Sequence, residues 1–254
     1  MQLLSVNTGR SRAVAYTANP AGTTGIDKRP VAEPVWVCAP GPMGTGGSGL
    51  AGDDVCDRRF HGGNDQAVYA YAREDLDRWE RELGRELPAG VFGENLTTLG
   101  IDLNAALVGE RWRVGSGPLL EVTSPRVPCR TFAGWLDERG WVKRFTETGL
   151  TGAYLRVVEP GAVQAGDPVE VVHRPGHEVT VGLVFRARTA EPALLPRVLA
   201  AGDALHPEDR ERAAHYMARG AGGAGSAGTA RNTGIAGKAE NAAAEGPEGP
   251  ADPA

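Results

Sequence analysis

Long apolar runs, cysteine and an excess of positive charge are all scarce in this sequence. No stretch approaches the roughly 18 consecutive apolar residues of a membrane-spanning helix, and the opening MQLLSVNTGRSR lacks the apolar centre of a signal peptide. Three cysteines among 254 residues are too few for a disulfide framework. The net charge of -5 excludes a global basic field that would recruit nucleic acid or anionic membranes. The sequence therefore predicts a cytoplasmic protein that binds neither nucleic acid nor membrane; its oligomeric state is undetermined.

Composition and hydrophobic patterning indicate a folded, β-rich domain. Hydrophobic residues make up 41% of the sequence and charged residues 23%, as in ordinary globular proteins. Short runs rich in Val and aromatic residues, bounded by Gly, Pro, Asp or Asn, predict strands over residues 3–7, 34–39, 66–72, 110–115, 119–124, 153–159, 168–173 and 178–187. Many short strands with few helices favour a mainly β, barrel-like α+β domain over a parallel α/β sheet.

Helical patterns occur in only a few places. Apolar residues recur at helical spacing within 72–87, and a short helix is predicted over 131–139 with Thr131 as its N-cap. Beyond 220 the chain is rich in Gly and Ala and cannot offset its own ordering entropy. We therefore expect three parts: a domain over 1–187, a short segment of amphipathic helices over 188–219, and a disordered tail over 220–254.

Two motifs that suggest other chemistry are incomplete. GTGGSG (44–49) has the glycine spacing of a dinucleotide-binding loop, but no helical pattern follows it to place an N-terminus against a pyrophosphate. His173 and His177 have the spacing of some zinc ligands, but no cysteine pair precedes them. Neither nucleotide binding through this loop nor a structural zinc site is favoured.

Cys129 lies in TSPRVPCRTF (123–132), close to Arg126 and directly before Arg130. Both arginines would favour the thiolate over the thiol, which lowers the pKa of the cysteine and makes its sulfur a better ligand or nucleophile. His61 is the obvious partner for a nucleophilic pair, although the sequence does not place the two side chains together. If the arginines instead face solvent, Cys129 is a small core residue. On local chemistry alone the functional and the structural interpretation weigh equally.

Three further segments carry polar residues suited to binding a ligand. RRFHGGNDQAVYAY (58–71) has a Gly-Gly turn between His61 and a predicted strand, VFGENLTT (91–98) places Asn95 in a tight polar turn, and TGIDKRPV (24–31) puts Lys28 ahead of a strand. Each segment alone is equally typical of an ordinary turn or a solvated surface. An independent reason is needed to bring them together.

That reason is a family resemblance. The segments TGIDKRPV, the AGD at 51–53, PAGVFGENLTT, GERWRVG, TSPRVPCRTF and GAYLRVVEPG occur in this order and at similar spacing in MOSC domains. The chain resembles this family, named for the C-terminal domain of molybdenum cofactor sulfurase, over about residues 1–187. The resemblance is to the stand-alone bacterial, YiiM-like subgroup, in which a small helical domain often follows.

The resemblance implies a MOSC-type β-barrel that binds molybdenum cofactor. Cys129, in the motif PRVPC, would be the protein ligand to molybdenum, and a thiolate is a soft ligand suited to such a centre. Other residues would contact the cofactor or line the mouth of the site: Lys28, His61, Gly62, Gly63, Tyr71, Asn95, Arg126 and Arg130.

The function implied is that of a molybdenum-dependent oxidoreductase acting on small N-hydroxylated compounds of the hydroxylaminopurine type. His61 would donate protons beside Cys129. Because the sequence contains no flavin, haem or iron–sulfur motif, the electrons would come from an external reductase partner.

An alternative of a different class is a carrier of sulfur or of the cofactor, in which Cys129 bears a persulfide or holds the cofactor without redox turnover. The sulfurase itself also has a large pyridoxal-phosphate domain. A chain of 254 residues already occupied by this domain leaves no room for one, which argues against self-sufficient desulfuration.

Overall fold

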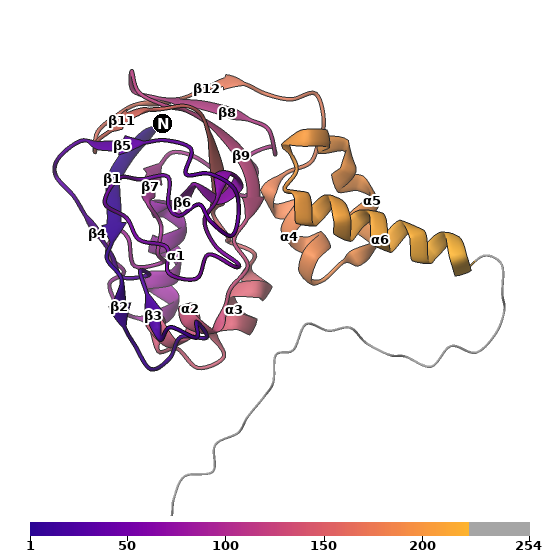
Figure 1. Ribbon diagram of the computed structural model, residues 1–254, viewed down its shortest axis with the longest axis horizontal. Helices are drawn as coiled ribbons and strands as arrows, with labels where there is room; N and C mark the ends of the chain where they lie inside the picture. Colours follow the sequence, from indigo (N-terminus) through magenta and orange to yellow (C-terminus); the bar gives the residue numbers. More distant parts are fainter. Residues whose placement is uncertain (224–254) are drawn as a thin grey trace, which may run out of the picture.

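The computed structural model describes residues 1–223 and shows a β-rich body with a group of helices at its side (Figure 1). Most of the predicted tail lies outside the described residues. The strands are β1 (Gln2–Gly9), β2 (Arg12–Ala13), β3 (Thr23–Thr24), β4 (Lys28–Pro30), β5 (Val35–Val37), β6 (Val68–Ala72), β7 (Leu96–Leu99), β8 (Arg111–Val114), β9 (Leu119–Pro125), β10 (Ala153–Glu159), β11 (Gly161–Val163) and β12 (Val169–His173).

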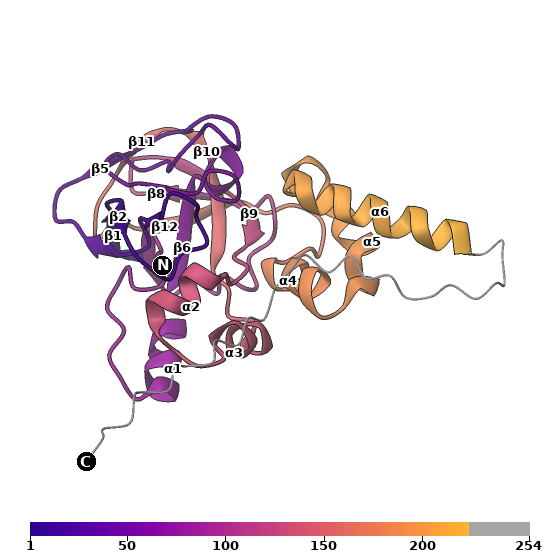
Figure 2. The same cartoon turned by 60° about the horizontal axis from the view of Figure 1, so that its bottom comes forward.

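The helices fall into two groups. The α-helices are α1 (Arg73–Leu83), α2 (Arg130–Leu136), α3 (Trp141–Thr148), α4 (Val181–Thr189), α5 (Leu195–Val198) and α6 (Pro207–Gly223), and the 3-10 turns are η1 (Asn64–Gln66), η2 (Pro192–Leu194) and η3 (Leu199–Ala204). Figures 1 and 2 show α1, α2 and α3 gathered at one end of the body and α4 to α6 beside it. The predicted boundary at 187 falls within α4. Within residues 1–223 no helix has the length and apolarity needed to cross a membrane.

The main sheet has eight strands in the order β12-β8-β9-β10-β6-β7-β1-β4. Neighbouring strands are antiparallel except β6 and β7, which are parallel and are joined by a crossover through α1. The sheet is open, with β12 and β4 as its edges. The predicted α+β class is therefore confirmed, whereas residues 1–223 show no closed barrel. The start of β12 also meets β1 at a bridge between Gln2 and Pro168. Backbone hydrogen bonds flank this bridge, from Leu3 to the carbonyl of Asp167 (2.9 Å) and from Val169 to the carbonyl of Met1 (3.0 Å).

Between the strands and the first three helices lies a cluster of aromatic side chains. Trp79 from α1 packs against Trp141 from α3, with ring centroids 4.6 Å apart, and donates from its indole nitrogen to the hydroxyl of Tyr71 (3.0 Å). Phe132 from α2 packs edge-on against Trp141. This cluster fixes α2, and with it the loop that carries Cys129, against the end of the sheet.

The observed helix boundaries correct the predicted ones. α1 ends at Leu83 because Gly84 takes a left-handed conformation (φ 67°), which L-residues disfavour. α2 begins at Arg130 with Cys129 in the N-cap position, so the prediction of Thr131 as N-cap was wrong. The Thr131 hydroxyl instead lies 3.1 Å from that of Thr17.

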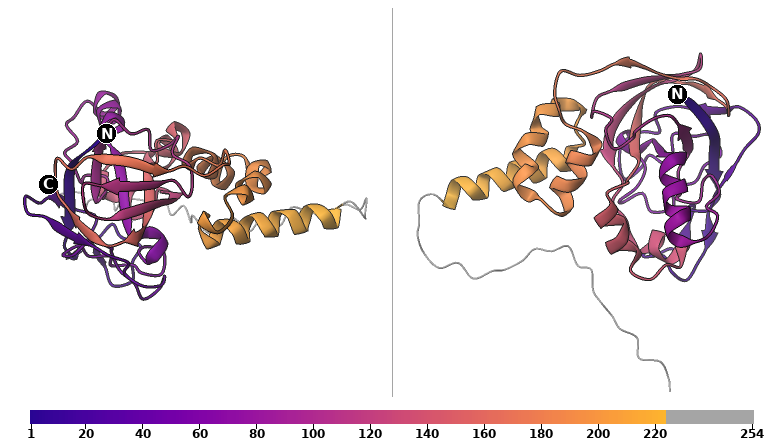
Figure 3. Two further views of the ribbon diagram at one scale, coloured as in Figure 1. Left: turned by 90° about the horizontal axis from the view of Figure 1, so that it is seen from above. Right: turned by 180° about the vertical axis from the view of Figure 1, so that it is seen from behind.

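The predicted strand over 178–187 was also wrong, because most of this segment is α4. Thr180 caps the helix by accepting a hydrogen bond from the backbone nitrogen of Leu183 (3.0 Å). Val181, Val184 and Phe185 are buried at helical spacing. β-branched residues favour strands, but in this segment the helical spacing of the apolar residues determines the structure, because it places them on one buried face of α4. The two views in Figure 3 show α6 extending away from the body.

Candidate functional site

A cavity of about 490 Å³ opens where the loops after β9 and before η1 face the segment around β3 and β4. Most of the predicted site residues line it: Lys28, His61, Gly62, Asn95, Arg126, Cys129 and Arg130. Gly63 and Tyr71 are not among the lining residues. Segments distant in the sequence therefore converge on one cavity.

Cys129 lies half-buried in this cavity, between β9 and α2, and its thiol is not in a disulfide. Burial, the largest single influence, raises the pKa of this thiol, but a hydrogen bond with His61 and the positive charge of Arg126 outweigh it. The net result is a pKa lowered to about 7. A large fraction of Cys129 is therefore thiolate at neutral pH, stabilised by His61 and Arg126 rather than by the neighbouring Arg130.

Arg126 is a buried charge that forms no direct ion pair within residues 1–223, although the charge of Glu94 acts on it at longer range. It is 8% exposed, and its guanidinium carbon lies 4.4 Å from the ring centroid of Phe132 and 5.0 Å from that of Tyr69. Within the described part of the chain no carboxylate lies at ion-pair distance from Arg126, and its Nε has no hydrogen-bond partner. Apart from the charge of Cys129, this buried cation contacts mainly aromatic faces, so it is suited to binding an anionic group in the cavity.

Lys28, by contrast, is neutralised within the protein. Its ammonium group forms an ion pair with Asp53, and both side chains are buried. Asp53 also accepts hydrogen bonds from the backbone nitrogen of Gly9 (2.8 Å) and from Nδ2 of Asn95 (2.9 Å). Asn95 is held in turn by the backbone nitrogen of Tyr69, which donates to its Oδ1 (3.1 Å). Lys28 and Asn95 thus form a rigid polar wall of the cavity.

The two glycines that follow His61 allow the chain to pack tightly against the 38–49 loop. Both have positive φ, 79° at Gly62 and 77° at Gly63, which favours glycine. A Cβ on Gly62 would lie 2.6 Å from the carbonyl oxygen of Gly47, and one on Gly63 would lie 2.8 Å from the backbone of Met43. The close approach in this turn is therefore to the protein's own backbone.

Tyr71, a predicted binding residue, lies within the aromatic cluster. Its ring is fully buried and packs against Phe92, with centroids 4.9 Å apart, and its hydroxyl donates to the backbone carbonyl of Leu150 (2.8 Å). In the structure its contacts are those of a core residue. The aromatic residue of β6 that reaches the cavity is Tyr69.

Several lining residues were not predicted. Asp53 and Tyr154 lie in the AGD and GAYLRVVEPG segments that carry the family resemblance. These two segments could therefore have been predicted to line the site. The helices contribute Arg188, Thr189, Glu208 and Arg212 to the cavity wall. No feature of the sequence placed these four residues near Cys129.

Among residues 1–223, no group of three or more His, Cys, Asp or Glu side chains could hold a metal ion. His173 and His177 therefore form no zinc site with other such residues in this part of the chain. A metal held at Cys129 would therefore also need ligands from a bound cofactor or solvent.

Comparisons with known proteins agree with these features. A sequence model of the MOSC domain matches residues 57–170. The Bacillus subtilis (strain 168) protein YflK is 32% identical, over 72% of this chain and 79% of YflK. This chain belongs to the MOSC domain family. The matched region of the MOSC domain contains His61, Arg126 and Cys129 but ends before α4.

Other relatives of this MOSC protein cover it to different extents. YiiM from Escherichia coli (strain K12) is 35% identical over 52% of this chain and 60% of YiiM. A Gibberella moniliformis protein named "Reductase" is 30% identical over 61% of this chain but only 28% of that protein. The crystal structure of YiiM from Geobacillus stearothermophilus superposes with a TM-score of 0.68 at 28% identity, covering 85% of this chain and 98% of that one. The likeness to the last structure therefore includes the helices beyond residue 170.

Proposed function

We propose that this MOSC protein is an oxidoreductase that binds molybdenum cofactor and reduces N-hydroxylated compounds with electrons from a separate partner. The observation that carries the proposal is the meeting of an ionisable thiol, Cys129, and an uncompensated buried guanidinium, Arg126, in one cavity. The relative named "Reductase" supports the same reaction class.

The residues present fit such a cofactor. A thiolate at Cys129 is a soft ligand of the kind that molybdenum accepts, and Arg126 would offset the negative charge of a phosphate-bearing pterin. Asn95, whose side-chain amide is held by Asp53 and by the backbone of Tyr69, would contribute a fixed polar group to the cavity lining. The cavity volume of about 490 Å³ lies within the usual range for small-molecule and cofactor sites. When bound, the cofactor would supply the two-electron redox chemistry.

The proposed reaction consumes two electrons and two protons. The N–O bond of the hydroxylamine breaks, and the products are the amine and water. His61, whose proximity lowers the pKa of Cys129, would hold and deliver a proton at the mouth of the cavity. Tyr69 and Tyr154 would shield the reacting group from bulk solvent, because both line the cavity and are held in the sheet.

The test uses protein from a host that makes the cofactor, with 6-hydroxylaminopurine as substrate and dithionite-reduced methyl viologen as electron source. We expect adenine to form with wild type and not with Cys129→Ala. Molybdenum-loaded wild type that forms no adenine would contradict the proposed substrate class. Full turnover without any electron source would contradict the need for a donor partner.

A second candidate function is favoured by the low pKa of Cys129. A thiolate paired with His61 is also an activated nucleophile, as a carrier of persulfide sulfur requires. A carrier would show a labile persulfide on Cys129 after incubation with a sulfur donor, together with no reduction of hydroxylaminopurine. Reduction without a persulfide excludes this alternative.

A further inference from the structure

One wall of the cavity belongs to helices outside the matched MOSC region. Arg188 and Thr189 come from α4, and Glu208 and Arg212 come from α6. The MOSC match ends at residue 170. The shape of the cavity therefore depends on how the segment 181–223, hereafter the helical segment, docks on the sheet.

The two parts of this wall are anchored differently. The start of α4 is fixed by backbone hydrogen bonds, from Val181 to the carbonyl of Ala106 (3.0 Å) and from Gly182 to that of Asn104 (2.9 Å). The turn before α6 packs through Leu205 in an apolar cluster that includes Val108, and its backbone carbonyls are bound by the side chain of Arg156 on β10. Arg188 pairs with Asp209 inside the helical segment, and that ion pair does not reach the sheet.

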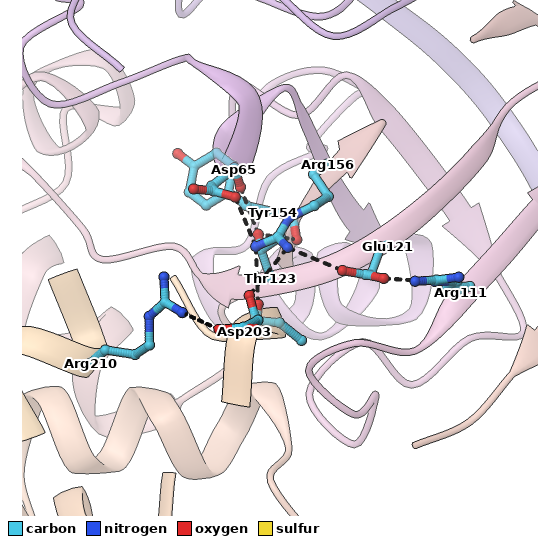
Figure 4. A network of polar contacts seen from close by, with 9 residues as sticks. Asp65, Arg111, Glu121, Thr123, Tyr154, Arg156, Asp203 and Arg210 are labelled. Atoms are coloured by element: carbon cyan, nitrogen blue, oxygen red, sulfur yellow. Dashed lines mark hydrogen bonds and ion pairs between the residues drawn. The ribbon is translucent and has the colours of Figure 1, made fainter. Parts of the chain in front are cut away.

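Arg156 occupies the junction between the sheet and the helical segment (Figure 4). Its Nη1 forms an ion pair with Glu121 (3.2 Å) and donates to the backbone carbonyl of Asp203 (3.4 Å). Its Nη2 forms an ion pair with Asp65 (2.8 Å) and donates to the backbone carbonyl of Ala204 (3.1 Å). One guanidinium thus contacts two carboxylates of the body and two carbonyls of the turn before α6.

The same arginine is connected to the residues around Cys129. Asp65 lies in η1, shortly after the turn that carries His61. The hydroxyl of Thr123 donates to the backbone carbonyl of Asp65 (2.6 Å) and lies 3.0 Å from the carbonyl of Tyr154, a cavity residue. A shift of Arg156 would therefore disturb both the α6 wall and the turn that presents His61.

We propose that Arg156 is a positioning residue for the substrate site. It fastens α6 to the sheet, so that Glu208 and Arg212 complete the cavity and the helical segment determines which substrates enter. A planar guanidinium can serve acceptors on several sides at once, whereas the ammonium group of lysine is a point donor. The substrate part of this inference rests on the proposed function, but the docking of α6 does not.

The experiment compares Arg156→Lys with Arg111→Lys as a matched control. Arg111 binds the other carboxylate oxygen of Glu121 (2.7 Å) and belongs to the same network. Among residues 1–223 its ion pair with Glu121 is the only one it makes, and it lies within the sheet. Two readouts need no cofactor: amide hydrogen exchange over residues 199–212, and the rate at which iodoacetamide alkylates Cys129, mapped by mass spectrometry. Exposed Cys38 serves as the internal reference.

In Arg156→Lys we expect both rates to rise about tenfold, because charge-assisted hydrogen bonds to the turn are lost. Arg111→Lys should stay within about twofold of wild type. Equal rates in the two variants, with both folded by circular dichroism, would overturn the proposal. If Arg156→Lys does not fold, Asp65→Asn removes one partner of Arg156 and should raise the same rates by a smaller factor; unchanged rates there would also overturn it.

A third readout addresses the substrate. In cofactor-loaded protein the KM for 6-hydroxylaminopurine should rise about tenfold in Arg156→Lys, with kcat changed less than about threefold. An equal fall of kcat in both variants would contradict positioning of the substrate wall. If no variant reduces the substrate, the proposed function fails, while the exchange and alkylation rates still decide the role of Arg156.

Discussion

Glu94 and Arg126 are both buried charged residues close to the cavity, but only Glu94 is surrounded by hydrogen-bond partners. Glu94 is fully buried and accepts from the backbone nitrogens of Gly90 (2.6 Å) and Phe92 (3.0 Å) and from the hydroxyl of Thr97 (2.9 Å). Arg126 is 8% exposed, and within residues 1–223 its Nε has no partner.

The difference distinguishes a buried charge that stabilises the fold from one that, under the proposed function, binds an anionic ligand. Buried polar groups in native proteins are almost always hydrogen-bonded, so a buried group without a partner indicates a functional role or a missing partner. Glu94 holds the turn that presents Asn95, even though burial raises the pKa of its carboxyl. Arg126 contributes no such bond, and the cavity beside it supplies the place for an anionic partner.

The largest effect is expected from removing Glu94. Glu94→Ala leaves two backbone N–H groups and one hydroxyl buried without an acceptor, which should lower the free energy of unfolding by about 3–5 kcal/mol. Urea denaturation followed by tryptophan fluorescence measures this change. The control is Glu86→Ala, an exposed glutamate, which should change the stability by less than about 0.5 kcal/mol. Similar urea midpoints for Glu94→Ala and Glu86→Ala would contradict the structural role assigned to Glu94.

Arg126→Met should show the opposite pattern. Because the guanidinium has no carboxylate partner, replacing it with an apolar side chain should change the free energy of unfolding by less than about 1 kcal/mol. Retention of molybdenum after purification should fall about tenfold, since the anionic cofactor loses its counter-charge. Arg78→Met, on the exposed side of α1, is the control. If Arg126→Met lowers the free energy of unfolding by several kcal/mol but leaves the molybdenum content unchanged, Arg126 stabilises the fold and does not bind the cofactor.

A smaller effect concerns the pH dependence of Cys129. In cofactor-free protein its alkylation rate should rise with pH and reach half its plateau near pH 7, because the thiolate reacts and its pKa is about 7. His61→Gln removes the hydrogen bond that lowers this pKa, so the midpoint should move upward by about one unit. A wild-type midpoint near 9.0, the ordinary value for a cysteine thiol, would contradict the account of the pair.

Much of the fold could be predicted from local patterns. The predicted strand over 153–159 matches β10 in full, because its Val and aromatic content and the flanking turn residues both indicated it. The strand predicted over 178–187 was wrong because β-branched residues favour strands locally, whereas the helical spacing of Val181, Val184 and Phe185 buries one face of α4. The barrel expectation came from the number of short strands and from the family, and pairing between distant edges cannot be inferred from local sequence.

The site was less accessible to reasoning from the residues. Cys129, His61 and Arg126 could be named as reactive types, but only the resemblance brought them together. Their mutual distances depend on the aromatic cluster under α2 and on the turn at Gly62 and Gly63. The contributions of α4 and α6 had no sequence signal, because they arise from docking through backbone carbonyls, which carry no residue identity.

The most direct test of the central claim is the molybdenum content of purified wild type and Cys129→Ser, both expressed in a host that makes the cofactor. If Cys129 is the protein ligand in a cavity built for an anionic cofactor, wild type should carry close to one molybdenum per chain, and the variant almost none, while both unfold at similar urea concentrations. Equal molybdenum in both proteins, or none in either, would contradict the account.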